Sequence, residues 1–172
     1  MLAAHSFSCY NVREVKNVEM TEDTCMQLAL EKAQEALMQG EVPVGAVLVK
    51  DGKVLCAFGN RREADHDPTA HAEMLCLREG ARLLGDWRMQ DCALYVTLEP
   101  CPMCAGAMVM SRLGQCIYGA SDAQKGCCGS VYDLPDDPSL GSTTRWKAGV
   151  RQAECQALLD AFFARKRQKD QR

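Results

Sequence analysis

The most informative stretch for the fold is Leu94-Tyr-Val-Thr-Leu-Glu-Pro-Cys101-Pro-Met-Cys104. Its first half is an apolar run typical of a buried strand, and its second half places a proline in the first turn of a helix. Two cysteines three positions apart at a helix start lie on one face, where the helix dipole favours thiolate over thiol. The stretch therefore predicts a strand that turns directly into a helix and presents two sulfurs to a metal.

A second informative stretch is His71-Ala72-Glu73, which begins another expected helix. His71, Cys101 and Cys104 form a ligand set that suits zinc better than magnesium or calcium, which prefer oxygen. Zinc with three protein ligands keeps its fourth position open for water, and Glu73 is then free to move protons. A CxxC pair alone is weak evidence in a chain with 11 cysteines, but the two motifs together are specific.

The alternative interpretation is a closed zinc site that only stabilises the fold, which needs a fourth protein ligand. The remaining histidines and the most suggestive spare thiols are His5, His66, Cys127 and Cys128. We favour the open site, because a closed one would leave Glu73 without a role. Most other cysteines fall in apolar stretches, where they are expected to be small buried side chains.

The segments around these motifs predict alternating strands and helices. Asp51-Gly52 between two apolar runs indicates a hairpin, and Gly40 can end the first helix. The order hairpin, helix, strand, helix, strand implies an α/β fold, a three-layer α/β/α sandwich with a mixed sheet of about five strands. The expected helices are 26–37, 70–84, 102–112 and 153–167, the expected strands are 42–49, 54–58, 92–98, 116–118 and 143–147, and 120–142 is expected to be a long loop.

The length and composition fit one globular domain, expected at residues 21–172 after an N-terminal extension at 1–20. Met20-Thr21-Glu22-Asp23 is typical of a helix start, with an N-cap followed by acids in the first turn. No stretch is long and apolar enough to cross a membrane, and the first twenty residues lack the apolar core of a signal peptide. Scattered cysteines without an export signal favour a reducing compartment, so we expect a cytoplasmic protein without membrane partners.

Charge is distributed unevenly along the chain, whose net charge is −3. Residues 165–172 hold five cations and one anion, so this end carries +4 and the rest carries −7. A basic end on an acidic body can contact phosphates. Charge alone fits a solubilising helix end equally well, since cations are favourable at a helix C-terminus.

Beyond these motifs the sequence resembles the bacterial tRNA-specific adenosine deaminases, the TadA family, over nearly all of residues 21–167. The pairing of His-x-Glu with Pro-Cys-x-x-Cys marks the wider group of cytidine-deaminase-like zinc enzymes. The runs that favour the tRNA enzyme are Glu41-Val-Pro-Val-Gly-Ala-Val-Leu-Val49, Asp67-Pro-Thr-Ala-His-Ala-Glu73, Leu94-Tyr-Val-Thr-Leu-Glu-Pro-Cys101, Met103-Cys-Ala-Gly-Ala-Met108, Tyr118-Gly-Ala-Ser-Asp122 and Ala161-Phe-Phe-Ala-Arg-Lys-Arg167.

The resemblance implies a zinc-dependent hydrolase that converts adenosine to inosine at the wobble position of a tRNA anticodon, and that acts as a homodimer. It implies one zinc ion per subunit, and Glu73 as the proton shuttle for water attacking adenine C6. It also implies that Asn60 reads the adenine, that Val44 and Leu98 line the base pocket, and that Asp122 lies near the ribose. The basic residues expected to contact the tRNA anticodon arm are Arg165, Lys166 and Arg167.

Two other functions remain open from the sequence. One is a deaminase of free cytosine, cytidine or guanine, and the other is a zinc-stapled module that binds nucleic acid without catalysis. Without the resemblance, Asn60 would be interpreted as a turn residue and Asp122 as a loop cap. The sequence departs from the family pattern in its N-terminal extension, around Thr143, and at Ser121 and Cys127-Cys128.

Overall fold

A mixed five-stranded sheet forms the centre of the computed structural model, which describes residues 20–170. The helices are α1 (Glu22–Met38), α2 (Arg62–Asp65), α3 (Ala72–Leu84), α4 (Pro102–Met110) and α5 (Gln152–Asp170), with a short 3-10 turn at Pro138–Leu140. The strands are β1 (Gly45–Lys50), β2 (Lys53–Gly59), β3 (Cys92–Leu98), β4 (Gln115–Ala120) and β5 (Arg145–Lys147).

The strands are arranged in the order β2-β1-β3-β4-β5. Strand β1 is antiparallel to both β2 and β3, whereas β3, β4 and β5 run parallel to one another. The parallel pairs require crossovers, which α4 and the long loop after β4 provide. The predicted mixed α/β sheet is confirmed.

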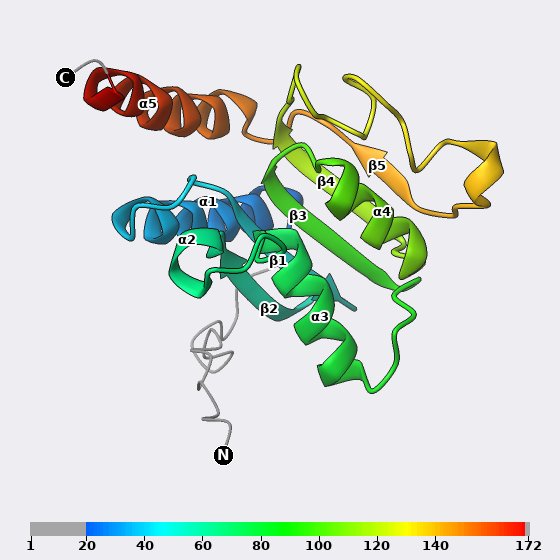
Figure 1. Cartoon of the computed structure of the whole chain (residues 1–172). Coiled ribbons are helices and arrows are strands. Elements are labelled where there is room, and N and C mark those ends of the chain that lie inside the picture. Colours follow the sequence, from blue (N-terminus) through cyan, green and yellow to red (C-terminus); the bar gives the residue numbers. More distant parts are fainter. Residues whose placement is uncertain (1–19, 171–172) are drawn as a thin grey trace.

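Helices cover both faces of this sheet, as Figure 1 shows. Gly45 and Gly119, on one face, lie directly against α1 and against Cys155 of α5. Gly80 of α3 lies against Leu48, which points to the opposite face, and α4 packs beside α3. The predicted three-layer α/β/α sandwich is therefore confirmed.

Several element boundaries differ from those expected. Helix α3 begins at Ala72 rather than at residue 70, because His71 is its N-cap with extended backbone. The loop expected between β2 and α3 contains the short helix α2, and β4 is six residues long rather than three. Thr21 caps α1, since its Oγ1 accepts a hydrogen bond from the amide of Thr24, as the sequence predicted.

The segments that matter for function meet at one end of the strands. We call this end, where the parallel strands finish, the C-terminal edge of the sheet. The carboxyl ends of β3 and β4 meet there because these strands are parallel, and β1 begins there because it runs the other way. This edge therefore holds the start of β1, the end of β2, the β3–α4 turn and the loop after β4. It is the position at which α/β sheets commonly bind ligands.

Two further features concern the whole described chain. No helix within residues 20–170 is long and apolar enough to span a membrane. The predicted N-terminal extension lies outside the described residues, except for Met20.

Candidate active site

Three side chains from two helix starts converge at this edge. Cys101 Sγ lies 3.7 Å from His71 Nδ1 and 3.7 Å from Cys104 Sγ, and Cys104 Sγ lies 3.6 Å from His71 Nδ1. The three ligand atoms thus form a nearly equilateral triangle, in which Cys104 is buried and the other two are partly exposed.

The local backbone explains why these atoms face one another. His71 and Cys101 are the N-caps of α3 and α4, both with extended backbone. An N-cap side chain usually bonds to the first amides of its own helix. Neither side chain does so here, and both are therefore free to face the space between the two helix starts.

The donor set and its spacing fit zinc. With bonds of about 2.3 Å to sulfur and about 2.05 Å to nitrogen, tetrahedral zinc separates two sulfurs by about 3.8 Å and a sulfur from a nitrogen by about 3.6 Å. The three measured separations match these values within 0.1 Å. Within residues 20–170, no fourth histidine, cysteine or carboxylate joins this group. The described residues therefore favour an open site over a closed one.

The thiols of the two cysteines have shifted pKa values. The hydrogen bond with Cys104, followed by the one with His71, lowers the pKa of the Cys101 thiol to about 4. The shared hydrogen bond and burial raise the pKa of Cys104. A metal ion binds cysteine as thiolate, so its binding would displace any proton that the two sulfurs still hold.

Glu73 lies two residues after the candidate ligand His71, in the first turn of α3. Its side chain is buried, and its Oε2 atom has no hydrogen-bond partner within the described residues. Burial raises the pKa of this carboxyl, and His71 and Cys101 are close enough to influence it. A buried carboxylate oxygen without a partner costs free energy, so its presence points to a chemical role.

Known proteins are similar to this chain over most of its length. The family model for the cytidine and deoxycytidylate deaminase zinc-binding region matches residues 20–120. The tRNA-specific adenosine deaminase of Bacillus subtilis (strain 168) is 43% identical over 151 residues, which cover 87% of this chain and 94% of that protein. Its counterpart from Haemophilus influenzae is 43% identical over 86% of each protein. The chain belongs to the tRNA-specific adenosine deaminase family.

Solved structures agree with this assignment. One, from work on A-to-I editing by tRNA:A34 deaminases at the wobble position, is 39% identical with a TM-score of 0.77 and covers 79% of this chain and 99% of that chain. The guanine deaminase of Bacillus subtilis is 38% identical with a TM-score of 0.56, and it covers 59% of this chain and 65% of that chain. A guanine deaminase from Nitrosomonas europaea, 20% identical with a TM-score of 0.75, shares the fold. The resemblance to the tRNA deaminase family is therefore confirmed.

The expected base-pocket residues lie at the same edge as the metal triad. The backbone amide of Asn60 donates to the carbonyl of Val44, and the next residue, Arg61, donates to the carbonyl of Ala70. Because Arg61 follows Asn60 and Ala70 precedes His71, these bonds bring the backbone at Asn60 close to the start of α3. Leu98 ends β3 and pairs with Ala120, so it borders the same edge. The structure brings these residues together, and their contacts with a base remain predictions.

Asp122 follows β4 in the loop beside the triad. Its Oδ1 accepts hydrogen bonds from the amides of Gln124 and Lys125, the pattern of a loop cap. The proposed contact with the ribose remains a prediction. Cys127 and Cys128 belong to the same loop and are fully buried, and neither joins the metal group. His66 is exposed at the C-cap of α2 and does not join the metal group, whereas His5 lies outside the described residues.

Two buried carboxylates were missed by the sequence interpretation. Glu41 is 1% exposed and accepts hydrogen bonds from Asn60 Nδ2 and from two amides at the start of α2. Glu99 is 2% exposed and accepts hydrogen bonds from the amides of Asp122, Cys128 and Ser130, which connects the loop after β4 to the β3–α4 turn. The available signal was an acid flanked by apolar residues and proline in both Glu-Val-Pro and Leu-Glu-Pro.

The basic residues Arg165, Lys166 and Arg167 lie on the exposed last turns of α5. This end of α5 projects beyond the sheet in Figure 1. Exposure leaves the three cations accessible to a phosphate backbone, and their contact with RNA remains a prediction.

Proposed function

We infer that this protein hydrolyses adenosine to inosine at the wobble position of a tRNA anticodon. The observation that carries this inference is the open triangle of His71, Cys101 and Cys104 beside the unpartnered carboxylate oxygen of Glu73. The family supplies the substrate class, since its members are named for tRNA adenosine. The proposed deaminase unit comprises residues 21–172.

A zinc ion held by His71, Cys101 and Cys104 would activate a water molecule as the nucleophile at neutral pH. Glu73 accepts the proton of this water at the oxygen that lacks a partner. It then delivers the proton to the departing 6-amino group, so that adenosine and water become inosine and ammonia. Asn60 orients the base through its edge, and the apolar walls at Val44 and Leu98 exclude bulk water.

The experiment for this function uses the purified, zinc-loaded chain and an anticodon stem-loop with adenosine at position 34. Inosine formation is scored by mass, with free adenosine, cytidine, cytosine and guanine as parallel substrates. We expect turnover of the stem-loop and no turnover of the free compounds. If free guanine is deaminated and the stem-loop is not, the result would instead support a deaminase of free bases. The similar guanine deaminase of Bacillus subtilis is a precedent for that activity.

We propose that Arg165, Lys166 and Arg167 bind the anticodon arm. Replacing all three by alanine should weaken stem-loop binding about 10-fold or more at physiological salt. It should also make the plot of the logarithm of the binding constant against the logarithm of the salt concentration less steep. The expected change in slope is about 2, at roughly 0.7 per lost phosphate contact. The single-turnover rate at saturating RNA should stay unchanged, because these side chains lie on the far turns of α5.

Lys53 in the β1–β2 hairpin provides the charge control for this measurement. It is exposed and lies at the end of the sheet opposite the metal triad. Lys53→Ala should leave both the affinity and the salt slope as in the unmodified chain. A triple variant with an unchanged salt slope would contradict the proposed tail contact.

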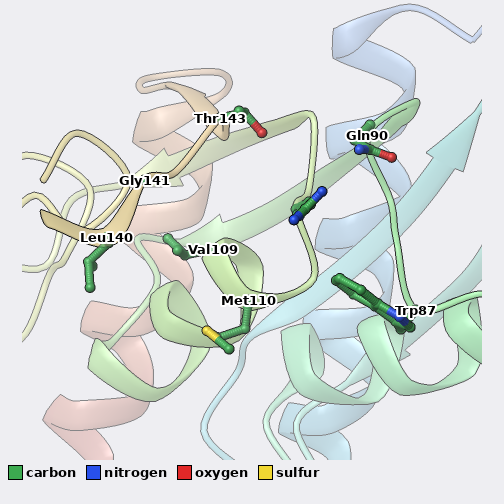
Figure 2. Close-up of a pocket in the computed structure, with 8 residues that line it drawn as sticks. Trp87, Gln90, Val109, Met110, Leu140, Gly141 and Thr143 are labelled. Atoms are coloured by element: carbon green, nitrogen blue, oxygen red, sulfur yellow. The ribbon is translucent and has the colours of Figure 1, made fainter. Parts of the chain in front are cut away.

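We also propose that the protein acts as a homodimer through the exposed face of α4. This helix carries no charged residue, and Met110 at its end is 75% exposed. Figure 2 shows the adjacent groove, of about 320 Å³, where Trp87, Val109, Met110 and Leu140 surround an open space. None of the proposed zinc or base residues lines this groove, so it is available to a second copy.

Met110→Glu should raise the dimer dissociation constant by about 10-fold or more, because a buried charge without a partner is costly. Sedimentation equilibrium measures this constant. Met38, which is 80% exposed on α1, offers the matched control, and Met38→Glu should leave the constant unchanged. An equal effect of both variants, or a monomeric unmodified chain, would contradict the proposed interface.

The cytoplasm is the proposed location. Every cysteine within the described residues is a free thiol, including the buried pairs. Free thiols in this number fit a reducing compartment.

A further inference from the structure

A network of hydrogen bonds fixes the side chain of Asn60 in one orientation. Asn60 Nδ2 donates to Glu41 Oε2 at 2.9 Å, and both side chains are buried. The other carboxylate oxygen, Glu41 Oε1, accepts from the amides of Glu63 at 3.0 Å and Ala64 at 2.9 Å. Both oxygens of Glu41 are therefore occupied by donors, and the carboxylate is held at the start of α2.

We propose that Glu41 is a positioning residue that sets which edge of a purine Asn60 can read, an inference that rests on the proposed function. A carboxylate only accepts hydrogen bonds, so the nitrogen of the Asn60 amide must face Glu41. A flipped amide would place Asn60 Oδ1 against a buried carboxylate oxygen. That arrangement loses a hydrogen bond and brings two acceptors together.

This orientation leaves Asn60 Oδ1 on the side away from Glu41. Within the described residues, Oδ1 accepts no hydrogen bond, and the bond from the Arg61 amide to the Ala70 carbonyl brings the chain at Asn60 close to the proposed ligand His71. An acceptor oxygen with one remaining N–H beside it matches the adenine edge, which has a donor at N6 and an acceptor at N7. The same atoms mismatch inosine or guanine, which present an acceptor at O6. Glu41 thus selects a 6-amino purine over a 6-oxo purine, and with it substrate over product.

Glu41→Gln tests this orientation directly. The new amide keeps an oxygen for the two amides of α2 and turns its NH₂ toward Asn60. Asn60 then flips to accept that hydrogen bond, and its own NH₂ faces the base. We expect the kcat/KM for the adenosine-34 stem-loop to fall by about 10-fold or more, in the range of one lost base contact.

A second readout separates orientation from general damage. An inosine-34 stem-loop is added as an inhibitor, and the ratio of its inhibition constant to the KM of the adenosine stem-loop is measured. Glu41→Gln should lower this ratio by about 10-fold, because the flipped amide now donates to O6. A role of Glu41 in the fold alone would leave the ratio unchanged, and such a result would overturn the proposal.

The double variant Glu41→Gln with Asn60→Asp provides a rescue. The new amide donates to the new carboxylate, which again presents an oxygen to the base. The double variant should recover at least about 10-fold in kcat/KM over Asn60→Asp alone, which sets two buried carboxylates against each other. Glu63 is exposed on α2, and Glu63→Gln serves as the control for loss of one negative charge nearby.

The outcomes distinguish this proposal from the function on which it rests. An unmodified chain that forms no inosine in the stem-loop would contradict the proposed function. An active unmodified chain whose double variant shows no recovery would overturn the role of Glu41 only. If Glu41→Gln and the double variant both fail to fold by circular dichroism, Glu41 supports the backbone of α2 and the proposal is also overturned.

Discussion

Replacing Glu73 by alanine should abolish inosine formation while the protein keeps its zinc and its fold. Removal of a general acid and base costs about 10²–10⁴-fold in rate, and Glu73 is proposed to act in both proton transfers. We therefore expect a loss at the upper end of this range or beyond. Single-turnover deamination of the adenosine-34 stem-loop measures it.

The structure explains why zinc and stability should survive this change. Glu73 lies outside the ligand triangle, and its Oε2 atom makes no hydrogen bond within the described residues. Glu73→Gln, which keeps the side-chain volume, should melt at the same temperature as the unmodified chain or higher, because a buried group without a partner opposes folding.

Glu79 lies on the same helix and pairs with Arg82 at the surface. Glu79→Ala controls for the loss of a carboxylate from α3 and should remain active. Deamination retained by Glu73→Ala would remove this residue from the mechanism.

Cys101→Ala should remove both zinc and activity. Two sulfurs and one imidazole are proposed to hold the metal, and the ligand triangle has no spare member within residues 20–170 that could replace the lost thiolate. Elemental analysis should fall from about one zinc per chain to below about 0.1 after dialysis against a weak chelator. The unmodified chain should also lose stability on zinc removal, because a ligand bound only to the native state stabilises it.

Cys127 provides the matched control for this variant. It is fully buried in the neighbouring loop, and its amide donates to the carbonyl of Pro100, yet its sulfur is not part of the metal group. Cys127→Ala should retain zinc and activity. A fully metallated Cys101→Ala protein would count against the assigned ligand set.

Local sequence was sufficient for the elements that carry the chemistry. The strand, proline and cysteines from Leu94 to Cys104 predicted a strand–turn–helix unit, and the structure contains β3 followed directly by α4. Such patterns are readable because periodicity, N-caps and proline position act over only a few residues. The same locality explains the small boundary errors, such as His71 being an N-cap rather than a helical residue.

Local patterns in the chain predicted three candidate metal ligands, a carboxylate beside them and the alternation of strands and helices, and the structure confirms the alternation. Only the tertiary structure decided that His71 meets the two cysteines at one sheet edge, and that Glu41 and Glu99 are buried to hold Asn60 and the loop after β4. The physical reason is that a carboxylate's partners are amides distant in the chain. The order and direction of the strands bring the carboxylate and these amides together, and patterns of a few neighbouring residues do not predict that pairing.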